Sequence, residues 1–133
     1  MALIRIEPDV QQKLAILGAE AQDEMTEAPS TAPVPKLIPN ATDYLYDAKP
    51  EAGGRTRLFK VLQTNACRYA CKYCFTSCAV RRRRTTFKPD ELATTFISLH
   101  RRQQADGLFL SSGIVPDADR TMEKMLATVE RLR

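Results

Sequence analysis

All four cysteines of this chain lie in one short stretch of the sequence, at Cys67, Cys71, Cys74 and Cys78. Thiolates are the ligands that iron-sulfur clusters and zinc take in proteins. A disulfide framework would spread its cysteines over distant segments of the chain, which this arrangement does not do. The cysteines therefore predict a metal site rather than a set of disulfides.

The spacing of the first three cysteines, C-x3-C-x2-C, favours an iron-sulfur cluster with one open iron. Three thiolates can bind three irons of a 4Fe-4S cube, and the remaining iron is free for a small molecule, as in catalytic metal sites. Two alternatives use Cys78 as a fourth ligand: a zinc site in a nucleic-acid interaction module, or a ferredoxin-type electron carrier. Zinc sites usually hold two separated pairs of ligands. Apart from these ligand roles, Cys78 could be a spare thiol near the cluster or a packed small side chain, and we expect the packed side chain.

Alternating strands and helices are predicted around the cysteines. A strand over Arg57–Thr64 ends shortly before them and is apolar on both faces. A helix covers Pro89 to about Gln104 and is ended by Gly107. A short buried strand follows at Gly107–Ser111, and a last helix runs from about Asp119 to the end of the sequence. The apolar face of this last helix is predicted to be Met122, Met125, Leu126, Val129 and Leu132.

This order of elements, βαβα, predicts an α/β fold with parallel strands and right-handed crossovers over residues 56–133. Residues 1–55 are expected to form an extension of different character. A helix is predicted over Pro8–Met25, with Val10, Leu14, Leu17 and Ala21 on one apolar stripe. The prolines between Thr26 and Arg55 predict a linker or surface loop without regular structure.

The basic residues of the chain are concentrated in its middle. Most Lys and Arg residues lie between Arg55 and Arg102, including the run Arg81, Arg82, Arg83 and Arg84. This run could contact the phosphates of DNA, or it could be an ordinary solvated loop. His100 is expected on the polar surface of its helix. No segment is apolar for long enough to cross a membrane, and the N-terminus is charged too early for a secretory signal. We therefore expect a cytoplasmic protein with no membrane partner.

The cysteine loop directly after the first core strand, with aromatic Tyr73 just before the third cysteine, resembles the signature of the radical S-adenosylmethionine superfamily. The resemblance implies a partial (βα)6 TIM-like barrel in which Cys67, Cys71 and Cys74 hold a 4Fe-4S cluster. It also implies that S-adenosylmethionine binds the open iron, and that an electron donor reduces the cluster to produce a 5'-deoxyadenosyl radical. Tyr73 would then contact the cosubstrate.

In that superfamily the second strand ends in a small-residue motif that contacts the amino group of the cosubstrate. Here the second core strand ends in Ser111, Ser112 and Gly113. Small residues permit close approach of the backbone, and serine hydroxyls can accept hydrogen bonds from an ammonium group. The acid that often accompanies the motif is absent, so the similarity is one of position and size.

Several stretches resemble one group within the superfamily, the DNA modification/repair radical S-adenosylmethionine proteins. These stretches are Lys13–Ala21, Leu58–Cys67, Gly107–Ile114 and Thr121–Glu123. The resemblance implies DNA as a substrate and a partner protein related to uracil-DNA glycosylases. Asp23–Pro39 departs from the pattern.

A barrel of this type has about six strand-helix units, and the sequence predicts the first two. We therefore expect a fragment of the enzyme, inactive in isolation. Such a chain should expose the apolar edge of the strand Gly107–Ser111 and should aggregate or need a partner.

Overall fold

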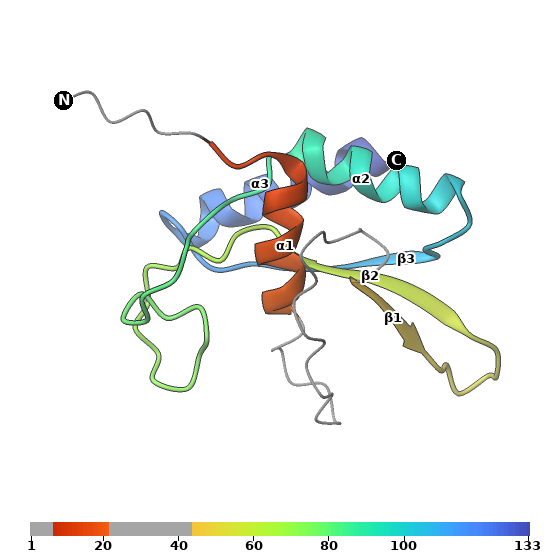
Figure 1. Cartoon of the computed structure of the whole chain (residues 1–133), viewed down its shortest axis with the longest axis horizontal. Helices are drawn as coiled ribbons and strands as arrows, with labels where there is room; N and C mark the ends of the chain where they lie inside the picture. The colour runs from red at the N-terminus through yellow and green to blue at the C-terminus, as the bar shows by residue number, and fades with distance from the viewer. Residues whose placement is uncertain (1–6, 22–43) are drawn as a thin grey trace.

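The computed structural model describes residues 7–21 and 44–133 and shows a mixed α/β fold (Figure 1). Within these residues, three helices accompany a three-stranded sheet, with the strands in the order β1-β2-β3. In chain order the elements are α1 (Val10–Ala21), β1 (Leu45–Ala48), β2 (Thr56–Leu62), α2 (Pro89–Arg101), β3 (Gly107–Ser111) and α3 (Ala118–Leu132). Figure 1 shows the long loop between β2 and α2 at the end of the sheet opposite the β1–β2 hairpin.

Strands β2 and β3 pair in parallel, with Leu58 opposite Gly107 and Leu62 opposite Ser111. This pairing and the crossover through α2 confirm the predicted parallel arrangement. It brings the carboxyl ends of β2 and β3 to the same edge of the sheet, so the loops that follow them are neighbours. Within the described residues β3 is an edge strand, as the sequence predicts.

The prediction of no regular structure between Thr26 and Arg55 is wrong for its last part. Residues 45–48 form β1, which pairs antiparallel with β2. The strand is short, and its stability comes from backbone pairing with β2 rather than from a periodic pattern of its own. Tyr44, just before it, packs on Gly18 of α1 so closely that a Cβ at Gly18 would lie 2.6 Å from the ring. The proline-rich residues 26–43 lie outside the described part of the chain.

Helix α1 has the predicted apolar stripe. Leu14, Leu17 and Ala21 are buried in the core. Asp9 caps the helix, because its Oδ1 accepts a hydrogen bond from the Gln12 backbone N at 2.8 Å while the Gln12 side chain accepts from the Asp9 backbone N. The predicted end at Met25 lies outside the described residues.

A partly buried charge pair joins α1 to the start of α2. Lys13 is buried, and its Nζ lies 2.8 Å from Oε2 of Glu91. The same carboxylate accepts a hydrogen bond from the Lys88 backbone N. Burial of Glu91 acts to raise the pKa of its carboxyl. The hydrogen bonds from Lys13 and Lys88, together with their positive charges, outweigh this effect, so the pKa is lowered from its ordinary value.

Helix α2 ends differently from the prediction. It stops at Arg101, and the chain turns at Gln103, whose φ of 56° is in the left-handed region. Gly107 therefore does not end the helix but begins β3, where it lies against Leu58. His100 is on the surface, as predicted, with its Nδ1 2.9 Å from the carbonyl oxygen of Ala105.

Helix α3 packs differently from what its sequence pattern suggests. Met122 and Leu126, which belong to the predicted apolar face, are 54% and 52% exposed. The buried residues of this helix are instead Thr121 and Thr128. The Thr128 hydroxyl donates a hydrogen bond of 2.8 Å to Oε1 of Gln63, a buried residue directly after β2. The inward side of α3 is therefore held by a polar contact. No helix in the described parts of the chain is long and apolar enough to cross a membrane.

Candidate metal centre

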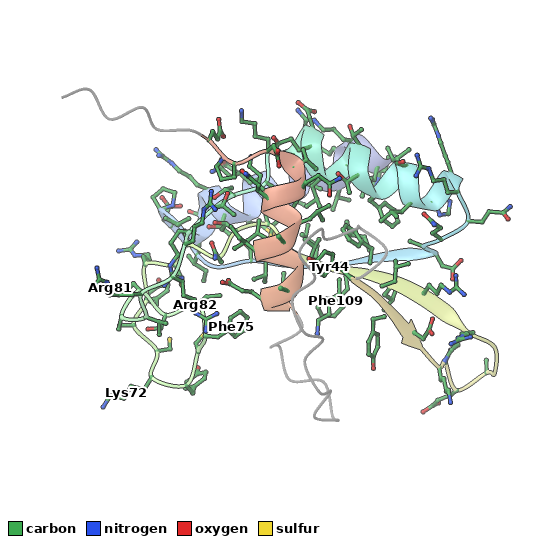
Figure 2. All side chains as sticks on the ribbon, in the orientation of Figure 1. Tyr44, Lys72, Phe75, Arg81, Arg82 and Phe109 are labelled. Atoms are coloured by element: carbon green, nitrogen blue, oxygen red, sulfur yellow. The ribbon has the colours of Figure 1, made fainter. Side chains whose placement is uncertain are left out.

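The cysteines lie on residues 63–88, the long loop between β2 and α2, which we call the cysteine loop. In Figure 2 this loop carries the labelled residues Lys72, Phe75, Arg81 and Arg82. The loop begins at the carboxyl end of β2 and returns to it, because Thr64 and Thr86 form an isolated β-bridge. Its base is therefore fixed to the sheet, while its middle extends into solvent.

The four thiols are free and accessible to different degrees. Cys67 and Cys74 are half-buried, whereas Cys71 and Cys78 are exposed. The Sγ of Cys74 lies 3.1 Å from Oγ1 of Thr76. The expectation that Cys78 is a packed side chain is wrong, because a small turn leaves it at the loop surface.

Backbone hydrogen bonds determine the path of the loop through the cysteines. The Cys74 N donates to the Cys71 carbonyl at 3.3 Å, and the Ser77 N donates to the Cys74 carbonyl at 3.1 Å. The Cys78 N donates to the Tyr69 carbonyl at 2.9 Å, which closes the turn. Cys71 and Cys74 thus lie inside this hydrogen-bonded turn, and Cys67 lies two residues before it.

The end of β3 contacts the start of this turn directly. The Gly113 N donates to the Thr64 carbonyl, and the Arg68 N donates to the Ile114 carbonyl, both at 2.8 Å. A Cβ added at Gly113 would lie 2.3 Å from the carbonyl oxygen of Ala66 and 3.3 Å from Cβ of Cys67. The predicted motif after β3 and the first predicted ligand are therefore neighbours, and only glycine permits the approach.

The other residues predicted to bind the cosubstrate occupy two different environments. Ser111 and Ser112 are half-buried beside Gly113, and the Ser112 hydroxyl donates to the Gly113 carbonyl at 2.7 Å. The Ser111 carbonyl accepts from the Gln63 N at 2.8 Å. Tyr73, in contrast, is 95% exposed on the middle of the cysteine loop. The structure brings the Ser-Ser-Gly turn to the loop's base and leaves Tyr73 in solvent.

Arg84 organises the cysteine loop from within. Its Nη1 donates to the carbonyls of Asn65 and, at 2.9 Å, Thr76, and its Nη2 donates at 2.7 Å to the carbonyls of Ser77 and Val80. One guanidinium thus satisfies four backbone acceptors from both ends of the loop. Arg84 differs in this respect from the rest of the arginine run.

The other three arginines of the run lie at more exposed positions than Arg84. Arg82 lies 3.4 Å from Oε1 of Glu20 in α1, with its guanidinium over the Phe75 ring. Arg81 and Arg83 are exposed. Only these outer positions are available for the predicted contact with DNA.

A buried polar run supports the loop and was not predicted. Gln63, Thr64 and Asn65 follow β2 and are all buried. The Asn65 side chain accepts from the Thr85 N and donates to Glu20 Oε2, each at 2.8 Å, and the Thr64 hydroxyl donates to the Thr85 carbonyl. A polar triplet directly between a strand and the first cysteine is the sequence signal that could have indicated this role.

The donor set suits an iron-sulfur cluster in its chemistry. The thiols of Cys67, Cys71 and Cys74 are accessible, and no Asp, Glu or His stands between them in the sequence. Thiolates are the ligands that such clusters take. Within residues 7–21 and 44–133 no three His, Cys, Asp or Glu side chains are already arranged to hold a metal ion. Cluster binding would therefore reorient the side chains of Cys67, Cys71 and Cys74.

No family model, curated protein or solved structure matches this chain. The interpretation of the site therefore depends on its own residues.

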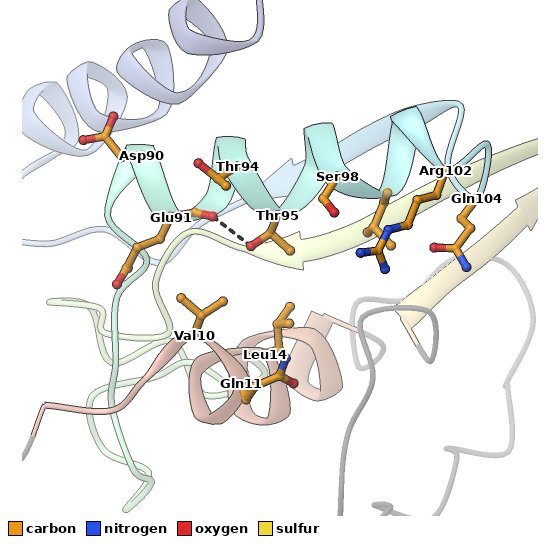
Figure 3. Close-up of a pocket in the computed structure, with 11 residues that line it drawn as sticks. Val10, Gln11, Leu14, Asp90, Glu91, Thr94, Thr95, Ser98, Arg102 and Gln104 are labelled. Carbon is orange, nitrogen blue, oxygen red and sulfur yellow. Dashed lines mark hydrogen bonds between the residues drawn. The ribbon is translucent and has the colours of Figure 1, made fainter.

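A groove of about 610 Å³ lies between α1 and α2, away from the cysteine loop (Figure 3). Thr94, Thr95 and Ser98 of α2 face Val10 and Leu14 of α1 across it. The Thr95 hydroxyl donates to the Glu91 carbonyl at 2.8 Å, and Glu91 itself is bound by Lys13. None of the predicted site residues lines this groove.

Proposed function

We propose that this chain carries the cluster-binding and cosubstrate-binding part of a radical S-adenosylmethionine enzyme. Cys67, Cys71 and Cys74 hold a 4Fe-4S cluster, and Tyr73 and the Ser111–Gly113 turn contact S-adenosylmethionine. The observation that carries the proposal is the contact of Gly113 with Ala66 and Cys67. When bound, the reduced cluster supplies the electron for cleavage of the cosubstrate's sulfonium.

The residues of the chain itself have three tasks in this proposal. The turn closed by the Cys78–Tyr69 hydrogen bond carries Cys71 and Cys74, and Cys67 lies two residues before it. The parallel register of β2 and β3 places the Ser-Ser-Gly turn beside them. Serine oxygens and backbone carbonyls of that turn can accept hydrogen bonds from the cosubstrate's ammonium group.

The proposal extends to the fold. β2, α2, β3 and α3 are the first two strand-helix units of a partial (βα)6 barrel, and the open edge of β3 is where a further parallel strand would pair. Residues 56–133 then form the start of the core. The extension before them contributes β1 to the same sheet.

DNA is the proposed substrate, and the support is the resemblance to DNA modification/repair proteins together with the basic loop. A partner related to uracil-DNA glycosylases, an electron donor and a cytoplasmic location belong to the same proposal. We place the substrate contacts at Arg81, Arg82 and Arg83, because Arg84 is bound to loop carbonyls.

Anaerobic reconstitution with iron and sulfide tests the metal site. The wild-type chain should take up about four irons and acquire the visible absorption of a 4Fe-4S cluster. Cys71→Ser should lose most of this iron, and Cys78→Ser is the matched control, because both cysteines are exposed on the same loop. Retention of iron in Cys78→Ser supports a three-thiolate site with an open position.

Two results would contradict the proposal. Equal loss of metal in Cys71→Ser and Cys78→Ser, with stoichiometric zinc and no colour, would indicate the four-cysteine zinc module. A reconstituted wild-type protein that binds no S-adenosylmethionine in equilibrium dialysis would remove the cosubstrate site. Saturable binding of S-adenosylmethionine by the reconstituted protein is the corresponding positive result.

A further inference from the structure

The outer side of the cysteine loop combines positive charge with an exposed aromatic ring. We define the loop surface as Arg68, Tyr69, Lys72, Arg81 and Arg83, all of which are exposed. Figure 2 shows Lys72 and Arg81 extending outward from this part of the chain. Tyr73, assigned above to the cosubstrate, is not part of the surface.

The charge of the loop surface is not neutralised by nearby acids in the sequence. No Asp or Glu occurs between Glu51 and Asp90. In the described part of the chain, the acid from elsewhere that contacts the run is Glu20 of α1, which pairs with Arg82. Arg81 and Arg83 have no ion pair among the described residues, so their charges face solvent. An uncompensated cluster of this kind attracts a polyanion.

The aromatic ring of Tyr69 is held in place rather than loosely exposed. The Tyr69 carbonyl accepts from the Cys78 N at 2.9 Å, and the preceding Arg68 N donates to the Ile114 carbonyl at 2.8 Å. The Arg68 guanidinium lies 5.6 Å from the centre of the Tyr69 ring, and its Nη1 donates to the Pro116 carbonyl. The ring is therefore 47% exposed on a backbone fixed on both sides.

We propose that the loop surface binds single-stranded nucleic acid, with a base stacked on Tyr69 and phosphates held by Arg68, Lys72, Arg81 and Arg83. A fixed aromatic face among cations is the arrangement with which proteins bind single strands, because unpaired bases expose their faces for stacking. A duplex keeps its bases stacked on one another and would use only the charges. An anionic membrane fits less well, because Val80 is the only exposed large aliphatic side chain of the loop.

The inference names the substrate class of the proposed function, namely single-stranded nucleic acid. It rests on the proposed function only for the claim that the bound strand is the substrate. Binding itself requires neither cluster nor cosubstrate. Iron content and S-adenosylmethionine binding, measured without oligonucleotide, therefore test the proposed function separately. If the chain binds neither iron nor S-adenosylmethionine but still binds single strands, the proposed function is wrong and the loop surface remains a nucleic-acid site. If it binds iron and S-adenosylmethionine but no single strands, only the proposal for the loop surface is wrong.

Fluorescence anisotropy with a labelled oligo-dT of about 16 nucleotides tests the surface on the full chain. Tyr69→Leu should weaken binding by at least about five-fold, and Tyr69→Phe, which keeps the ring, should restore it. Tyr46→Leu is the matched control, because Tyr46 on β1 is 42% exposed and far from the loop in sequence and in the fold. Wild-type-like circular dichroism of each variant shows that the fold is retained.

The phosphate contacts are tested by salt dependence. Replacing Arg81 and Arg83 by Gln should flatten the slope of log affinity against log salt by about 1.4, or about 0.7 for each lost contact on a single strand. Arg101→Gln with Arg102→Gln removes the same charge from the end of α2 and should leave the slope unchanged. Equal effects of the two pairs, equal affinity for a duplex of the same length, or preferential binding to phosphatidylserine vesicles would overturn the proposal.

Discussion

Arg84 shows how a single side chain can shape a loop that has no regular secondary structure. Its guanidinium binds the carbonyls of Asn65, Thr76, Ser77 and Val80. These carbonyls would otherwise need water or a different backbone path. In the sequence, Arg84 is indistinguishable from its three neighbours, and only the fold separates it from them.

Replacing Arg84 by Met should lower the free energy of unfolding by about 2–3 kcal/mol, because several charge-assisted hydrogen bonds to carbonyls are lost together. Arg83→Met, at an exposed position, should change it by no more than about 0.5 kcal/mol. Urea unfolding followed by circular dichroism compares the two. Similar losses for both variants would show that the Arg84 hydrogen bonds contribute nothing specific.

Gly113 is the second residue whose identity the local geometry requires. Gly113→Ala would place a methyl group 2.3 Å from the Ala66 carbonyl oxygen, so the backbone of one loop must move. We expect a loss of about 1–3 kcal/mol in stability and weaker uptake of iron during reconstitution.

Gly107→Ala is the matched control for Gly113→Ala. Its added methyl group would meet only the end of the Leu58 side chain at 3.0 Å, which can move aside. Iron uptake in Gly107→Ala should therefore equal that of the wild type. If Gly113→Ala also took up the full amount of iron, the close approach of the two loops would be irrelevant to the metal site.

At the level of the helices, the Lys13–Glu91 pair joins α1 to α2 and makes this contact sensitive to pH. Because the folded-state pKa of Glu91 lies below the ordinary value of 4.5, the charged carboxylate stabilises the fold above that pH. The contribution disappears as the pH falls through the lowered pKa. Protonation also leaves the buried ammonium of Lys13 without its closest counter-charge.

Glu91→Gln should therefore destabilise the protein at pH 7 and have a smaller effect at an acidic pH below the lowered pKa of Glu91, where the wild-type carboxylate is itself protonated. The adjacent Asp90→Asn is the control, because Asp90 is exposed and pairs with exposed Arg131. Urea midpoints at the two pH values provide the measurement. An effect of Glu91→Gln that is the same at both values would contradict the assigned role.

The elements were predictable from the sequence where a periodic pattern or a helix-start signal was strong. Proline at the start of α2 and the apolar run of β3 gave correct elements. β1 was missed, because its stability comes from pairing with β2, a contact that local sequence does not report. α3 was placed correctly, but hydrophobic periodicity reports only which side of a helix is apolar, and the side that packs here carries Thr121 and Thr128.

The residues of the candidate site could be named from the sequence, but the contacts that support them could not. The cysteines and the Ser-Ser-Gly turn were identified from residue type and order, and the parallel strands bring Cys67 and Gly113 together. The support provided by Asn65 and Arg84 was not predictable, because polar side chains that bind backbone groups have no repeating pattern. Thiol spacing indicates a ligand set, but it does not reveal what holds the loop in shape.

The molecule as a whole has an incompletely covered apolar surface. Met122, Leu126 and Val129 form an exposed ridge on α3, and Phe109 is exposed on the edge strand β3. Exposed apolar patches of this kind favour association with other molecules. The ridge and the strand edge agree with the expectation that the isolated chain associates with itself or with a partner.

Changing Met122 and Leu126 to Lys should reduce self-association, measured by sedimentation velocity, while the free energy of unfolding changes by no more than about 0.5 kcal/mol for each exposed site. Leu99→Ala, at a buried position of α2, should instead cost about 2–5 kcal/mol. A wild-type chain that is monomeric at all concentrations and unfolds cooperatively would contradict the expected association.

The hydrogen bonds of Arg84 have a consequence for transplanting the cysteine loop into another protein. The carbonyls that Arg84 binds extend from Asn65 to Val80, so the smallest self-consistent cassette is longer than the cysteine motif and includes residues 65–84. A graft that stopped at Cys78 would copy the ligand spacing but omit Arg84, whose hydrogen bonds hold the loop together. The receiving scaffold must also offer a backbone acceptor in the place of Thr64 and a glycine in the place of Gly113.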